Sequence, residues 1–268
     1  TDSGFMYVLS RAPDPKEDDG NKRSQPNFKR IGKWKLEDEF INDFAQNDIM
    51  WPVSLAVDEK GFLYCTDEIK NMILKYNSED QKVFEWGVEG SAEGQFSKPA
   101  GIVSDLAGHL YVVDAGNHRI QKFTSDGDFI HCWGEFGSER GQFNDPWGIT
   151  VDSQGFVYVA DWGNDRVQKF TGDGEWLQFF GVSSPDALKL NHPSDVAVDS
   201  EGDVYVADWG NKKVQIFDSD GEILTSLHGD ATEFSRSALN FLEVNQDYYK
   251  AFKRAKDKSR LGVFARPT

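Results

Sequence analysis

The residues of this chain that could do chemistry are mostly carboxylates, and many of them recur at a fixed spacing of 47 residues. Two series of aspartates follow this spacing: Asp58, Asp105, Asp152 and Asp199 form one, and Asp67, Asp114, Asp161 and Asp208 form the other. Carboxylates in such number would suit calcium binding or acid–base catalysis. Because a group needed once in every repeat serves the repeat itself, we interpret them as turn formers that accept backbone N–H bonds, or as partners of Arg119 and Arg166.

Binding residues are better sought where the repeat is broken. The residue after the repeated proline is Val, Ala or Ser in three copies but Trp147 in the other, and the following position holds Asp195 in the last copy. Aromatic platforms beside Arg and Asn suit sugar rings or extended peptides; packing between neighbouring sheets is the alternative role of the indoles. The candidate ligand-binding residues are Trp51, Trp147, Trp162, Trp209, His118, Arg119, Arg166, His192 and Asp195.

The histidines were considered as a metal site. His118, His192 and His228 all map to connections at one end of the repeats, and neutral imidazoles are zinc ligands. Each of them lies in a different connection, so we predict no metal and no cofactor. The sequence has no nucleophile elbow, HExxH, paired CxxC or phosphate-binding loop, and we assign no catalytic residue. A site assembled from several repeats would leave no such linear motif.

Each repeat predicts four short strands. From Pro146 they read GITVD, FVYVAD, RVQKF and WLQFF, with alternation or with β-branched and aromatic enrichment. Tight turns join them: Asp152–Gly155 connects the first strand to the second, and GDGE connects the third to the fourth. Four-stranded antiparallel sheets repeated every ~40 to 50 residues are the signature of an all-β propeller.

The repeat P-x-G-I-x-V-D-x-x-G-x-V-Y-V-x-D-x-x-N-x-R-V-Q-x-F is similar to the NHL repeat, and the chain resembles bacterial-type NHL-repeat proteins over almost its whole length. Gly4 and Tyr7 match the second strand of a repeat, and Arg266–Thr268 resembles the beginning of another first strand. We therefore predict a six-bladed NHL-type propeller, truncated at both ends, as one domain over 1–268. Four full blades, one nearly complete blade and the start of a sixth would be present.

The connections predict which end of the blades binds. Second-to-third and blade-to-blade connections lie at one end, here called the loop face, and loops on a rigid scaffold concentrate binding residues. Two insertions fall there. The polar segment 11–29 predicts a surface loop, and 229–265 predicts an amphipathic helix. We expect this helical insertion to cap the propeller rim; a lid or a partner-docking helix is the alternative.

The net charge and the length of the apolar runs limit the classes of partner that this chain can bind. A formal net charge of −16 disfavours nucleic acid and anionic lipid, and no apolar run approaches the ~20 residues of a membrane span. The predicted function is therefore a non-catalytic binding scaffold that binds a protein segment or a saccharide on its loop face.

The resemblance implies two alternatives. Related peptide-amidating lyases and lactonase-type propellers place a metal at the channel mouth, with histidines after the repeated proline in the lyases. Here those positions hold Val53, Ala100, Trp147 and Ser194. NHL propellers of animal ubiquitin ligases recognise substrates or bind RNA, and with only 2 Cys this chain has no zinc-binding RING of its own.

Overall fold

The computed structural model describes residues 4–10, 29–36, 39–182 and 188–228. These residues form nineteen strands in five antiparallel sheets, which we call blades 1 to 5. Blade 1 contains β1 (Phe5–Ser10), β2 (Arg30–Lys35) and β3 (Phe40–Phe44). Blade 2 contains β4 (Pro52–Val57), β5 (Leu63–Asp67), β6 (Met72–Tyr76) and β7 (Lys82–Trp86).

The other three blades repeat the four-stranded pattern. Blade 3 contains β8 (Pro99–Ser104), β9 (Leu110–Asp114), β10 (Arg119–Phe123) and β11 (Phe129–Trp133). Blade 4 contains β12 (Pro146–Val151), β13 (Val157–Asp161), β14 (Arg166–Phe170) and β15 (Trp176–Phe180). Blade 5 contains β16 (Pro193–Val198), β17 (Val204–Asp208), β18 (Lys213–Phe217) and β19 (Ile223–His228). Two short 3-10 helices, η1 (Ala115–Asn117) and η2 (Trp162–Asn164), join the second and third strands of blades 3 and 4.

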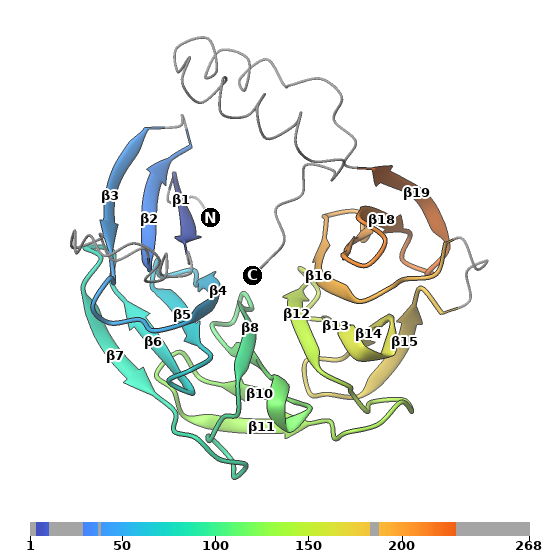
Figure 1. The fold of residues 1–268 in the computed structure, drawn as a ribbon, viewed down its shortest axis with the longest axis horizontal. Coiled ribbons are helices and arrows are strands. Elements are labelled where there is room, and N and C mark those ends of the chain that lie inside the picture. Colours follow the sequence, from blue (N-terminus) through green and yellow to red (C-terminus); the bar gives the residue numbers. More distant parts are fainter. Residues whose placement is uncertain (1–3, 11–28, 37–38, 183–187, 229–268) are drawn as a thin grey trace, which may run out of the picture.

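The blades follow one another around an arc, with β4, β8, β12 and β16 toward the middle (Figure 1). Within each blade the strands pair in chain order, so every blade is a simple meander. Each of these four inner strands shifts register just after its first proline, at the end nearest the loop face. The all-β propeller architecture agrees with the repeat pattern.

The predicted blade count and helix require correction. The described residues form a five-bladed propeller, so the prediction of six blades is wrong. The count of six rested on Arg266–Thr268, and a three-residue match defines neither a strand nor a pairing partner. Three segments lie outside the described residues: Arg266–Thr268, the predicted helical insertion at 229–265, and residues 11–28 of the predicted loop.

The repeated aspartates after the first strand form turns, as the sequence indicated. Asp58 Oδ1 accepts the N–H groups of Lys60 and Phe62 at 3.0 and 2.9 Å, and its Oδ2 accepts the hydroxyl of Tyr64 at 2.9 Å. Gly61 closes the turn with φ of 80°, a left-handed conformation that glycine adopts without strain. The same carboxylate bonds recur at Asp152 and Asp199, so the interpretation of this series as turn formers is confirmed.

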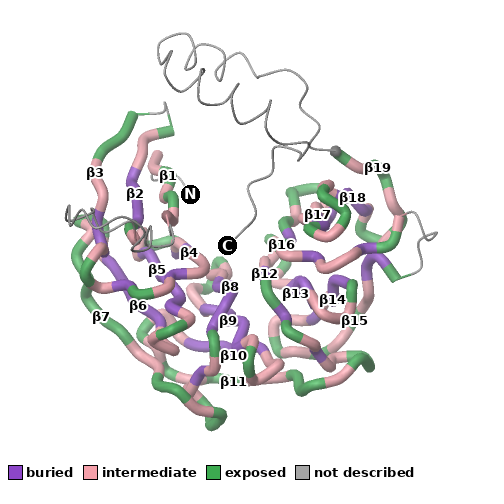
Figure 2. The backbone as a smooth tube through the Cα atoms, in the orientation of Figure 1, coloured by how far each residue is buried: buried purple, intermediate pink, exposed green. Residues whose placement is uncertain are grey.

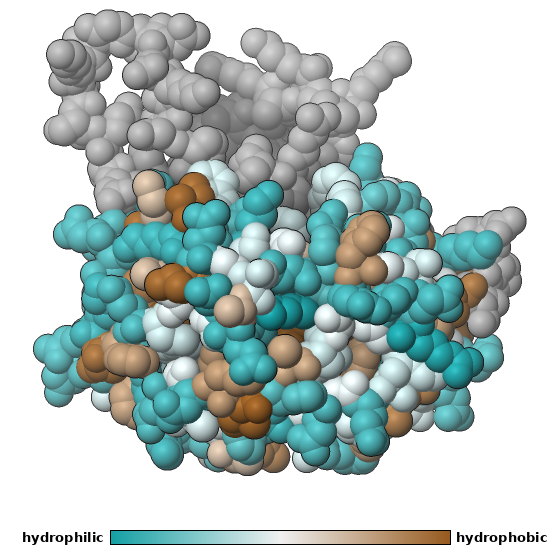
Figure 3. All heavy atoms as spheres, turned by 90° about the horizontal axis from the view of Figure 1, so that it is seen from below, coloured by the Kyte–Doolittle hydropathy of each residue, from teal (hydrophilic) through white to brown (hydrophobic). Residues whose placement is uncertain are grey.

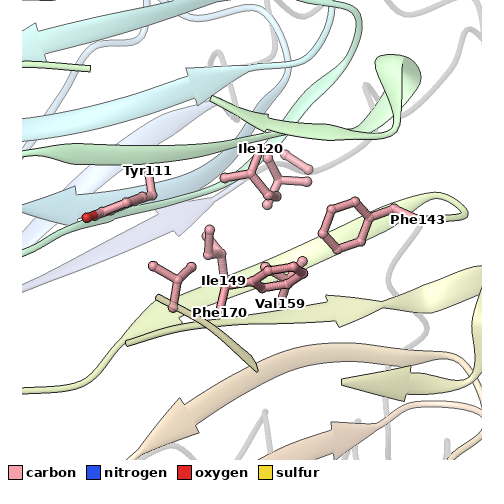
Figure 4. Close-up of a cluster of buried hydrophobic side chains, with 9 residues drawn as sticks. Tyr111, Ile120, Phe143, Ile149, Val159 and Phe170 are labelled. Carbon is pink, nitrogen blue, oxygen red and sulfur yellow. The ribbon is translucent and has the colours of Figure 1, made fainter. Parts of the chain in front are cut away.

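The hydrophobic core lies between blades. Buried residues concentrate on the second and third strands of each blade (Figure 2). In the seam between blades 3 and 4, Tyr111 and Ile120 pack against Ile149, Val159 and Phe170 (Figure 4). Full burial of such a side chain stabilises the fold by ~1.5 to 3 kcal/mol, so each seam fixes the relative position of two blades.

Lysines on the third strands reinforce these seams at the end opposite the loop face. Lys122 Nζ donates to the carbonyl of Gly172 in the next blade at 2.9 Å and lies 5.2 Å from the Tyr111 ring centroid. Lys75 makes the corresponding bond to Ser125 at 2.7 Å. Blades 2, 3 and 4 are therefore joined by both apolar packing and partly buried hydrogen bonds.

Apolar residues also occur on the outer strands. Val83, Ile130 and Leu177, spaced 47 residues apart, are exposed on β7, β11 and β15. Seen edge-on, hydrophobic side chains are interspersed with hydrophilic ones (Figure 3). Scattered exposed aliphatic residues are ordinary in folded proteins and do not by themselves mark a binding site.

Candidate ligand pocket on the loop face

A buried aspartate at the end of each second strand positions the loops of this face. Asp161 Oδ1 accepts the backbone N–H of Asn144 at 2.8 Å, while Oδ2 accepts bonds from Asn164 (2.9 Å), Arg166 (2.7 Å) and Gln168 (3.0 Å). Desolvation raises the pKa of Asp161, although the bonds from Asn144, Asn164 and Arg166 oppose it. The carboxylate therefore joins the loop within the blade to the connection from the preceding blade.

The two predicted ligand-binding arginines are engaged in this same framework. The Arg166 guanidinium donates to the carbonyls of Ser138, Glu139 and Gln142 at 2.6 to 2.8 Å, and its Nε pairs with Asp161. Arg119 repeats this pattern in blade 3. Its Nε pairs with Asp114, and its guanidinium donates to the carbonyls of Ser91, Ala92 and Gln95. The predicted partnership with the repeated aspartates is confirmed for both arginines. Their role in ligand binding stays a prediction, and these bonds argue for a positioning role.

A pocket of about 470 Å³ opens on the loop face over blade 3. Its wall is formed by residues of blades 2, 3 and 4 and of their connections: Val53, Glu68, Ser97, Lys98, Pro99, Ala100, Ala115, Gly116, His118, Asp145, Trp147 and Trp162. This volume is within the range of ordinary ligand sites, ~300 to 1,000 Å³.

The pocket forms where two adjacent repeats differ in side-chain size. Ala100 and Ala115 of blade 3 occupy the positions that Trp147 and Trp162 occupy in blade 4, 47 residues later. Two small side chains thus leave a space over blade 3, and the two indoles of blade 4 line it. Trp147 is 39% exposed, so its ring is accessible to a ligand.

A backbone hydrogen bond closes each seam beside the pocket. The N–H of Lys98 donates to Asn71 Oδ1 (2.8 Å), and that of Asp145 donates to His118 Nδ1 (3.2 Å). All four residues have positive φ, between 48° and 55°. Nδ1 of His118 is the acceptor of the bond from Asp145, which leaves Nε2 as the ring nitrogen that can donate.

The seam of blades 4 and 5 has the equivalent bond, but here the histidine supplies the backbone N–H and the aspartate accepts it. The N–H of His192 donates to Asp165 Oδ1 at 2.7 Å. The His192 ring packs edge-on against Trp162, with centroids 4.1 Å apart. His192 therefore contacts one wall residue of the pocket without lining the pocket itself.

The remaining predicted site residues lie apart from the pocket. Trp209 is 47% exposed on blade 5, and Trp51 precedes β4 at the seam of blades 1 and 2. Asp195 on β16 lies so close to Gly148 that a Cβ on that glycine would be 2.4 Å from Asp195 Oδ1. Desolvation raises the pKa of Asp195; the bond from the Val196 N–H (2.9 Å) opposes it.

Three predicted site residues are thus brought together: Trp147, Trp162 and His118. The sequence did not lead us to Glu68, Lys98 and Asp145 as pocket residues. It also did not point to Ala100 and Ala115, whose small side chains leave the space open. A signal was available, because both alanines are replaced by tryptophan one repeat later.

Within the described ranges, no group of three or more His, Cys, Asp and Glu side chains is arranged to hold a metal ion. His118 and His192 belong to different seams. In the same ranges, no helix has the length and apolar character needed to cross a membrane.

The meander blades and their repeated seams define a repeat β-propeller. Three stretches match the NHL repeat family model: residues 96–123, 143–170 and 190–217. The chain therefore contains NHL repeats, and its described residues form a β-propeller. Each matched stretch begins in the connection before a blade and ends with the third strand of that blade. No curated protein matches the chain in sequence.

Solved structures share this fold at low sequence identity. A catalytically inactive virginiamycin B lyase from Staphylococcus aureus with quinupristin has a TM-score of 0.58 and 19% identity, covering 76% of this chain and 64% of the lyase. A nidogen/laminin complex gives 0.58 and 19%, covering 75% of this chain and 72% of the other. A gluconolactonase from Xanthomonas campestris gives 0.56 and 16%, covering 74% and 68%. This chain spans less than two thirds of the lyase, and at these identities the likeness shows the fold alone.

Proposed function

We propose that this protein is a non-catalytic binding propeller whose pocket over blade 3 takes a segment of another protein. The observation that carries the proposal is the pocket itself, with Trp147 and Trp162 on one wall and Glu68, Lys98 and Asp145 around it. Indoles supply rigid contact area, and charged groups of both signs can pair with the varied side chains of a polypeptide.

The surroundings of the pocket support binding without large rearrangement. Aspartates bonded to backbone N–H groups hold the loops on both sides, and the seam bonds at Asn71 and His118 fix the rim. A preformed site loses little conformational entropy when it binds. The nidogen/laminin complex supports the proposal as a propeller of similar fold in a protein complex.

The test uses a substitution that the repeats themselves suggest. Ala115→Trp places in blade 3 the residue that blades 4 and 5 carry at this position, so the backbone accommodates it while the indole fills the pocket. A random nine-residue peptide library is panned against the 268-residue chain, and bound peptides are retested on the variant. Trp209→Ala, which removes an exposed indole outside the pocket, is the matched control.

We expect selected peptides to bind Ala115→Trp at least ~tenfold more weakly, a loss of ~1.4 kcal/mol in binding free energy. Their affinity for Trp209→Ala should be unchanged. Circular dichroism and thermal melting establish that both variants are folded. Peptides that bind Ala115→Trp unchanged would overturn the proposal. The same holds if no peptide binds while a glycan array gives hits that Ala115→Trp removes, since the pocket would then be a saccharide site.

A further inference from the structure

Two neighbouring seams give a template for what the pocket accepts. At the seam of blades 4 and 5, the Trp162 indole packs against the residue before the repeated proline, His192, at 4.1 Å. At the seam of blades 3 and 4, the corresponding residues are Ala115 and Asp145, and both line the pocket. In blade 4 an indole thus lies next to the residue before the proline. In blade 3 the equivalent space is empty, and the residue next to it is the carboxylate Asp145.

The charges around this space favour a cation. The Asp145 side chain is 59% exposed, and the basic group nearest to it among the described residues is His118 Nδ1 at 3.9 Å, an atom that accepts the Asp145 N–H. Glu68 adds a second carboxylate and Lys98 adds one ammonium; in the described part of the chain, neither of these two forms an ion pair. Carboxylates thus outnumber cations on the pocket wall.

The aromatic wall favours a planar cation. Guanidinium groups stack on aromatic faces, and they hydrogen-bond carboxylates with a fixed fork geometry. This chain already contains such contacts: the Arg140 guanidinium lies 4.5 Å from the Trp176 ring centroid, and that of the buried Arg166 lies 4.4 Å from the Phe179 ring centroid. Lysine has the charge without the flat shape, and phenylalanine has the shape without the charge.

We propose that the pocket binds an arginine side chain of the partner segment, with the guanidinium in the space that an indole fills one repeat later, next to Asp145 and against Trp147 and Trp162. This inference rests on the proposed function and names the residue that the site recognises. Lys98 opposes the incoming cation, so its removal strengthens binding.

The direct probes are small and chemically matched. Nα-acetyl-arginine amide, the isosteric but uncharged Nα-acetyl-citrulline amide and the charged but non-planar Nα-acetyl-lysine amide are titrated into the full chain and followed by indole NMR signals. We expect the arginine probe to bind about tenfold more tightly than either of the others, which is the combined size of a cation–π contact and a charge-assisted hydrogen bond at a partly exposed site.

Matched variants separate the pocket from the rest of the face. Asp145→Asn keeps the backbone N–H that bonds His118 and removes only the charge, and it should abolish the preference for arginine over citrulline. Asp165→Asn, which keeps an acceptor for the His192 N–H in the next seam, should leave that preference unchanged. Lys98→Ala should strengthen arginine binding severalfold.

Each outcome addresses one proposal. If citrulline binds as well as arginine, or if Asp145→Asn changes nothing, the arginine assignment is wrong. Panned peptides that need Ala115 but show no enrichment of arginine also overturn it while leaving the binding function intact. If no peptide depends on Ala115, the proposed function itself fails.

Discussion

The backbone N–H of Asp145 donates to Nδ1 of His118 across the seam of blades 3 and 4, with the two atoms 3.2 Å apart. The equivalent acceptor is Asn71 Oδ1 one seam earlier and Asp165 Oδ1 one seam later. Three different side chains thus perform one task, which shows that the seam requires an acceptor and not a particular residue.

This equivalence predicts how substitutions of His118 behave. His118→Asn, which copies Asn71, should leave the free energy of unfolding within ~0.5 kcal/mol of the natural chain, whereas His118→Ala should lower it by ~0.5 to 1.5 kcal/mol. Urea denaturation measures both. Equal losses for the two variants would show that the imidazole contributes through packing, for instance against Phe136, whose ring centroid lies 4.9 Å away.

Arg166 should be among the most costly residues to truncate. Its removal leaves the buried carboxylate of Asp161 without its cation and frees three carbonyls. We expect Arg166→Ala to lower the free energy of unfolding by ~3 to 5 kcal/mol. Arg140→Ala, which removes a guanidinium stacked on Trp176, is the control and should cost less than ~1 kcal/mol. Similar costs for the two would contradict a structural role for Arg166.

Asp195 should make stability depend on pH in an unusual direction. Desolvation raises its pKa in the folded state, so the folded protein binds this proton more tightly than the unfolded chain. Asp195 is also partly accessible to solvent, which screens its charge and keeps the effect on stability small. The charged carboxylate therefore destabilises the fold above its folded pKa, and this penalty disappears as the pH falls below the unfolded value of ~3.9.

The variant Asp195→Asn isolates this effect. It should be slightly more stable than the natural chain at pH 7, and the difference should shrink to zero on acidification. Thermal melting between pH 3 and 7 measures it, and Asp220→Asn, an exposed turn residue, should show no such difference. A stability difference that grows as the pH falls would contradict the assignment.

The lysine bonds between blades can be tested with another substitution taken from the repeats. Blade 5 carries Ile216 where blade 3 carries Lys122. Lys122→Ile should cost ~1 to 2 kcal/mol, because the partly buried carbonyl of Gly172 loses a donor while the isoleucine recovers some apolar contact. Guanidinium denaturation gives the value; a gain in stability would show that desolvating the ammonium outweighs its bonds.

The repeats made much of the framework predictable from the sequence. A constant spacing fixes the strands, and Asp58 with Gly61 defines a turn whose bonds follow from local chemistry. The number of blades could not be obtained in this way, since it depends on pairing across sheets and not on a three-residue likeness such as Arg266–Thr268.

The candidate site was only partly predictable for a different reason. Trp147, Trp162 and His118 were identified because they carry chemistry, but a pocket also needs residues that carry none. Ala100 and Ala115 contribute by being small, and a search for reactive groups passes over them. Arg119 attracts attention by its charge, yet its donors are used inside the fold.

The exchange of Ala115 for Trp162 between consecutive repeats has an evolutionary consequence. The bonds that hold each loop come from the aspartate and arginine framework, and the side chain at this position makes none of them. Selection can therefore alter which blade offers a cavity through one or two codon changes, while the scaffold keeps its stability. A face built in this way can acquire a new partner without first losing its fold.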